Sequence, residues 1–181
     1  LYSIWAAARD VAGNTQGQTE FVANKSSFTF YVDLSTPVVT MTNPPASNAF
    51  TNNMGIVTGG VADPNPGFNA GVHDVVNVKV QVKYVLGATT FYYDNGGNFS
   101  DTCPTCNETD SWFNPRSGNF TPLSPSQGNW VYDNGNIATK WVPNRTYVIS
   151  ARGVDDSSPL PNEAPADPLR RVGIVYDVGV S

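Results

Sequence analysis

The stretch Tyr2–Asp10 reads YSIWAAARD, and the stretch Tyr147–Asp155 reads YVISARGVD. Both place apolar or small residues at alternate positions, which is the period-two pattern of a half-buried β-strand. A second echo follows each of them, because Phe28–Asp33 reads FTFYVD and Val172–Asp177 reads VGIVYD. The first pair is offset by 145 residues and the second by 144. Matches at nearly one offset indicate an internal repeat, so the sequence predicts one copy of about 145 residues preceded by the last strands of another copy.

Short runs between the echoes, bounded by turn residues, predict further strands. These strands are expected at residues 37–42, 55–63, 76–84, 91–94, 112–113, 130–132 and 140–142. No window shows the periodicity of an amphipathic helix. We therefore expect an all-β fold, a β-sandwich. The stretch 87–140 exceeds the needs of such a domain and predicts an elaborated middle with extra hairpins and a cysteine-bearing loop.

The composition of the chain excludes some classes of binding partner. The 181 residues include 16 Gly and 14 Pro, which favour turns over helices, and 10 basic against 15 acidic residues give a formal net charge of −5. A nucleic-acid partner needs a basic surface, so this class is excluded. No run of 18 apolar residues occurs, so the sequence predicts no membrane insertion.

The two cysteines, Cys103 and Cys106, form a C-x-x-C pair. Such a pair is a redox site, half of a zinc site or a small disulfide. Its loop-like flanks supply no cation to activate a thiol, and His73 is the only histidine available to complete a zinc site. A structural disulfide is therefore favoured over free thiols, and it agrees with an extracellular setting.

The chain resembles the bacterial Ig-like domains that are repeated in large surface and secreted proteins. The resembling pieces are VDLSTP at 32–37, GGVAD at 59–63, GVHDVVNV at 71–78 and the paired strand endings quoted above. The second ending departs from the pattern, because Asp156-Ser157-Ser158 replaces the expected Ala-Gly-Asn. The resemblance implies an immunoglobulin-like β-sandwich preceded by the terminal hairpin of a preceding Ig-like repeat. Residues 1–33 are then the C-terminal strands of the preceding repeat, and residues 34–181 are a complete Ig-like β-sandwich domain. It also implies an extracellular spacer or adhesive module without catalysis.

Several aspartates fall at strand ends that an Ig-type sandwich brings to one end of the domain. They are Asp33 in the linker, Asp63 and Asp74 around the second loop, and Asp155 and Asp156 in the last loop. Clustered carboxylates repel each other unless a cation neutralises them, and Ca²⁺ takes 6–8 oxygen ligands. The hypothesis is a calcium ion at the domain junction. The alternative is that aspartate serves here only as a good turn residue.

Two further site hypotheses concern side chains of the middle region and its flank. The adjacent residues His73 and Asp74 could belong to a Ser-His-Asp catalytic triad, but the sequence contains no G-x-S-x-G motif to supply the serine. A solvated histidine is therefore favoured, and no catalytic residue is assigned. Trp112 and Trp130 are the candidates for a sugar-stacking face. The alternative is that these rings fill the core or pair across strands.

The function favoured by the sequence is a non-catalytic structural or adhesive repeat of a long extracellular or cell-surface protein. Its expected partners are neighbouring Ig-like repeats, with glycans or a cell surface as further candidates. One alternative is a subunit of an extracellular filament or surface layer assembled by strand addition. A second is an accessory carbohydrate-binding module.

Overall fold

A computed structural model describes residues 2–16, 27–30, 35–44, 49–51, 54–64, 75–113, 120–124, 126–133, 135–155 and 171–176. The elements are β1 (Tyr2–Trp5), β2 (Ser27–Phe30), β3 (Val38–Asn43), β4 (Ala49–Thr51), β5 (Ile56–Ala62), β6 (Val75–Leu86), β7 (Thr89–Tyr93), β8 (Phe99–Ser100), β9 (Phe120–Ser124), β10 (Gln127–Asp133), α1 (Gly135–Ala138), β11 (Arg145–Asp155) and β12 (Arg171–Tyr176). In this part of the chain, no helix has the length and apolar character needed to cross a membrane.

The strands form an all-β fold, as predicted. One sheet has the order β3-β5-β10-β9, and the other has the order β4-β12-β11-β6-β7-β8. All neighbours are antiparallel except β4 and β12, which are parallel. These orders match the ABED sheet and the GFCC′ sheet of an immunoglobulin-like sandwich. In that scheme β11 is strand F and β12 is strand G.

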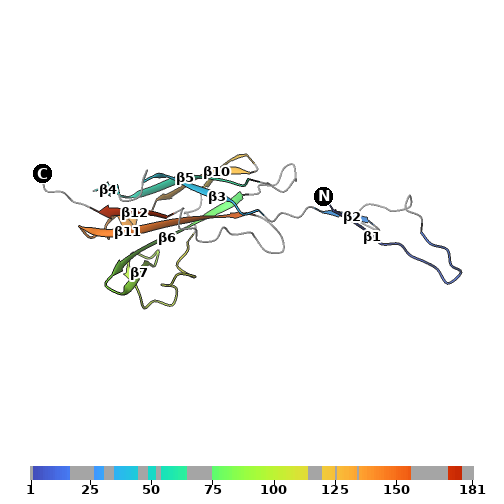
Figure 1. Cartoon of the computed structure of the whole chain (residues 1–181), viewed down its shortest axis with the longest axis horizontal. Coiled ribbons are helices and arrows are strands. Elements are labelled where there is room, and N and C mark those ends of the chain that lie inside the picture. The colour runs from blue at the N-terminus through green and yellow to red at the C-terminus, as the bar shows by residue number, and fades with distance from the viewer. Residues whose placement is uncertain are drawn as a thin grey trace.

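The two larger sheets lie face to face, and their inner side chains form the core (Figure 1). On the four-stranded sheet, β10 alternates between exposed and buried positions and buries Trp130 and Tyr132. On the six-stranded sheet, the alternate valines of β6 and the residues Tyr147 and Ile149 of β11 are buried. Because each strand presents one apolar face, stacking the sheets removes both faces from water, which is the main stabilising contribution of the fold.

A tyrosine corner fixes the turn before β11. The hydroxyl of Tyr147 accepts a hydrogen bond from the backbone N–H of Val142 at 2.8 Å, and the Trp141 ring meets the Tyr147 ring edge-on with centroids 4.5 Å apart. This arrangement at the start of strand F is a hallmark of Ig-like domains. Burial raises the pKa of the Tyr147 hydroxyl above its ordinary value. Residues 140–142 belong to this corner, so the prediction of a strand there is wrong. Trp141 is buried as a single anchor whose Nε1 donates to the Met54 carbonyl at 2.7 Å.

The middle region is elaborated, as expected. It contains the hairpin strand β7, the short strand β8 and the segment 101–113, which carries the cysteines. The expected strand at 112–113 is reduced to a single bridge between Phe113 and Val80.

The strands β1 and β2 form a separate two-stranded sheet that lies beyond one end of the larger sheets (Figure 1). Tyr2 is opposite Phe30, and Ile4 is opposite Phe28. Beyond β1, the carboxylate of Asp10 accepts hydrogen bonds from the backbone and the side chain of Asn14, at 2.8 and 2.7 Å. Gly13 has a φ of 92°, which glycine tolerates well. These contacts close the tight turn, and the hydrogen bonds from Asn14 lower the pKa of Asp10.

Candidate functional sites

Two of the five candidate calcium ligands are described, and both are buried at the same end of the sandwich. Asp63 follows β5, and its Oδ1 accepts a hydrogen bond of 2.6 Å from the Ser35 hydroxyl. Asp155 ends β11 and is buried as well. A Cβ placed on Gly153 would lie 2.5 Å from the Cβ of Pro37, so the end of β11 packs against the start of β3. The structure therefore places both carboxylates where the linker meets the domain.

Asp33, Asp74 and Asp156 lie outside the described residues, as does His73. Within the described ranges, no three side chains of His, Cys, Asp or Glu gather as a metal site would require. Two buried carboxylates fit the donor chemistry of calcium but fall short of its 6–8 ligands. The calcium site stays a prediction.

The cysteine loop is closed by a disulfide between Cys103 and Cys106, whose Cα atoms are 4.9 Å apart, as predicted. Residues 101–113, called here the disulfide segment, fold onto β6. Phe113 and Val80 exchange two backbone hydrogen bonds of 2.9 and 3.0 Å. The side-chain amide of the buried Gln81 donates to the Ser111 hydroxyl at 2.7 Å. The disulfide thus lies in a segment that covers part of the six-stranded sheet and has a structural role.

Glu108 is the centre of a polar cluster on the disulfide segment. Its carboxylate accepts hydrogen bonds from the Lys83 ammonium group and, at 3.0 Å, from the Tyr92 hydroxyl. Its backbone carbonyl accepts a hydrogen bond of 3.0 Å from the Trp112 indole. The guanidinium of Arg152 lies 4.4 Å from the centroid of the Trp112 ring. These contacts satisfy the side chains of a folded loop, and a cation covers one face of the Trp112 ring.

The second candidate ring has a different environment. Trp130 is 0% exposed, and its Nε1 donates to the Gly60 carbonyl at 3.1 Å. A ring without exposed surface cannot stack on a sugar, so Trp130 belongs to the core. Trp112 is partly exposed and is the remaining aromatic candidate for a sugar. Sequence reasoning gave no role to Glu108, because its partners Lys83 and Tyr92 are distant in sequence.

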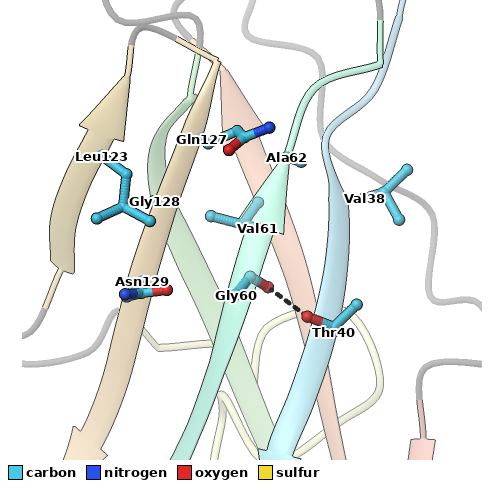
Figure 2. A pocket seen from close by; sticks show the side chains of 9 residues that line it. All are labelled: Val38, Thr40, Gly60, Val61, Ala62, Leu123, Gln127, Gly128 and Asn129. Atoms are coloured by element: carbon cyan, nitrogen blue, oxygen red, sulfur yellow. Dashed lines mark hydrogen bonds between the residues drawn. The ribbon is translucent and has the colours of Figure 1, made fainter.

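A shallow groove of about 290 Å³ lies on the four-stranded sheet (Figure 2). It runs over β5 and β10 between Thr40 on β3 and Leu123 on β9. The Thr40 hydroxyl donates to the Gly60 carbonyl at 3.3 Å. The lining residues are Val38, Thr40, Gly60, Val61, Ala62, Leu123, Gln127, Gly128 and Asn129. None of these lining side chains is titratable, so the groove offers no acid, base or charged nucleophile.

The β1–β2 sheet and its turn expose apolar side chains. Ile4, Trp5 and Val11 are all more than half exposed. Exposed apolar groups that gather on one small element are typical of surfaces that pack against another structure. The internal repeat predicts that this hairpin belongs to a neighbouring copy, but nothing in the sequence pattern singles out Ile4 or Trp5.

Comparison with known proteins gives no family. No protein-family model matches the chain, and no curated protein matches it. Among solved structures, the chain is similar to AggA, the major subunit of aggregative adherence fimbriae type I from Escherichia coli. The two share 10% identity with a TM-score of 0.31, over 82% of this chain and 99% of the AggA chain. A superposition this loose carries no argument about function.

Proposed function

We propose that the chain is a non-catalytic structural module of a long extracellular or cell-surface protein built from repeated Ig-like domains. Residues 34–181 form one copy, and residues 1–33 carry strands F and G of the preceding copy. The module extends the protein and joins its neighbours, as units in a linear array do.

The observation that carries this proposal is the register of β1 on β2. Tyr2 is opposite Phe30, and the residues 145 and 144 positions later, Tyr147 and Ile174, are also opposite each other. The same holds for Ile4 with Phe28 and for Ile149 with Val172. Two hairpins whose sequences echo each other thus also pair in the same register. Register is specified by side-chain pattern and turn geometry, so this agreement supports a structural repeat.

Burial supports the same proposal. Ile149 is 0% exposed because β6 and the facing sheet cover it, whereas its counterpart Ile4 is 60% exposed. An isoleucine at this position in a complete sandwich belongs to the core. The face of β1 that carries Ile4 is therefore the inner face of a sandwich whose other strands belong to the preceding copy.

Two experiments test this function against its alternatives. Sedimentation of the 181-residue chain over a wide concentration range should give one discrete species, because β3 to β12 in the described part of the chain already form both sheets of one sandwich. A polymer that grows with concentration would instead favour the filament subunit.

The carbohydrate-binding alternative rests on Trp112. A glycan panel should give no saturable binding. Saturable binding that is lost in Trp112→Ala and kept in Trp5→Ala, the matched control on the hairpin, would overturn the structural assignment in favour of this alternative.

A further inference from the structure

Gln81 on β6 and Ser150 on β11 are polar residues that lie directly opposite each other in the six-stranded sheet. The residues before and after each of them in its strand belong to the core, so the alternation of the strand turns these two side chains to the outer face of the sheet. They are nevertheless only 1% and 3% exposed, and the disulfide segment contacts Gln81 on this face. Both side chains therefore need hydrogen-bond partners inside the protein.

The orientation of the Gln81 amide is fixed by two acceptors on the disulfide segment. Its Nε2 donates to the Ser111 hydroxyl at 2.7 Å and to the backbone carbonyl oxygen of Glu108 at 3.2 Å. A carbonyl oxygen only accepts, so the nitrogen of the amide must face it. Both hydrogens on the nitrogen are then used, and Oε1 remains as an acceptor. Among the described residues, neither Oε1 of Gln81 nor Oγ of Ser150 has a hydrogen-bond partner.

A buried polar group without a partner is destabilising, because it has given up its hydrogen bonds to solvent. Side chains directly opposite on neighbouring strands have Cβ atoms about 5 Å apart, so one small molecule can bond to both polar groups. We propose that Gln81 and Ser150 bind a structural water molecule between β6 and β11. The water donates to Oε1 of Gln81 and forms a second hydrogen bond with the Ser150 hydroxyl. Buried waters make about two to four such bonds, so this pair of residues is sufficient.

The charges on the same face of the sheet favour a neutral ligand over an ion. Lys79 and Arg152 are the pair two positions along the strands, and their positive charges disfavour a metal cation. Lys83, two positions along in the other direction, is paired with the Glu108 carboxylate. An anion is disfavoured as well, because the oxygen of the Gln81 amide only accepts hydrogen bonds. A water molecule is neutral and both donates and accepts, so it suits the carbonyl oxygen and the hydroxyl together.

The bound water gives the Gln81 side chain a linking role. One end of its amide bonds to the disulfide segment, and the other end reaches β11 through the water. The segment, β6 and β11 are thus connected through a single buried side chain. This site lies within one copy of the domain, so it does not depend on the proposed function.

A high-resolution crystal structure of the 181-residue chain tests the site directly. One ordered water should lie within hydrogen-bond distance, about 2.7–3.2 Å, of both Oε1 of Gln81 and Oγ of Ser150. A direct hydrogen bond between the two side chains, or no ordered water at this position, would overturn the proposal. An ion at this position, identified by anomalous scattering from crystals soaked in rubidium or bromide salts, would overturn it as well.

Two valine variants on β11 provide a matched test in solution. Ser150→Val places methyl groups at the site and should expel the water, whereas Thr146→Val makes the same residue at an exposed position of the strand. Oxygen-17 relaxation dispersion counts long-lived water molecules without interference from exchanging hydroxyl protons. Its amplitude should fall by the contribution of one water in Ser150→Val and stay unchanged in Thr146→Val. Equal amplitudes in Ser150→Val and the unchanged chain would contradict the site, and the crystal structure decides the matter if Ser150→Val fails to fold.

Discussion

Gly59 and Gly60 are neighbours in β5 whose side-chain positions face opposite sides of the four-stranded sheet. A Cβ on Gly59 would lie 1.8 Å from the carbonyl oxygen of Thr40 and 2.8 Å from two ring carbons of Trp130. Ordinary contact distances are roughly 3.5 Å, so the backbone of β3 would have to move by more than about 1 Å. A Cβ on Gly60 has the Thr40 hydroxyl as its nearest neighbour, at 3.2 Å.

Gly59→Ala should therefore lower the free energy of unfolding by about 3 kcal/mol, the upper end of what overpacking a core costs. That loss corresponds to a fall in Tm of about 10 °C for a domain of this size. Gly60→Ala should change the free energy of unfolding by less than about 1 kcal/mol, because a hydroxyl on the outer face can adjust. Urea unfolding and calorimetry of the two variants measure both quantities. Equal effects of the two substitutions, or a neutral Gly59→Ala, would refute the assignment of Gly59 and Trp130 to the inner face.

Three further predictions follow from the site and the hairpin. Tyr147→Phe should reduce the free energy of unfolding by about 1 kcal/mol, because the backbone N–H of Val142 loses its acceptor; unchanged urea unfolding would contradict the tyrosine corner. In an NMR titration, the pKa of Asp10 should lie below its ordinary value of 3.8, and Asn14→Ala should raise it. The lowered pKa means that this carboxylate's contribution to the turn is complete above pH 3.8 and is lost as the pH falls through the folded-state pKa. For the calcium hypothesis, Ca²⁺ should raise the Tm of the chain, and Asp63→Asn combined with Asp155→Asn should abolish the shift; a shift that persists in the double variant would refute the site.

The strands and the repeat could be predicted from the sequence, because both depend on the local pattern of apolar residues. The alternation in Val76–Tyr84 and in Tyr147–Asp155 follows the pleat of strands with one buried face, so β6 and β11 could be predicted. The offset of the two echoes could be read from the sequence, and the structure pairs each echo in the same register.

The face that each tryptophan occupies could not be predicted in the same way. Trp130 lies on a strand whose buried positions alternate. It is two residues from Tyr132, so both side chains point to the same face of the sheet, into the core. Trp112 lies in the disulfide segment, where contacts with Glu108 and Arg152 place its ring on the sheet. Trp141 belongs to a corner rather than a strand, because a hydrogen bond to Met54, 87 residues away, holds it in place. Such long-range contacts leave no periodic signal in the sequence.

The intact mass and the peptide map of the native polypeptide test the central claim, that the β1–β2 hairpin completes a preceding Ig-like copy. The repeat architecture predicts a mass far above the 19.4 kDa of these 181 residues. It also predicts peptides from further copies, with strand endings like Tyr147–Asp155 recurring at a spacing near 145 residues. A native polypeptide of about 19.4 kDa, or a longer one without such recurrences, would contradict the claim.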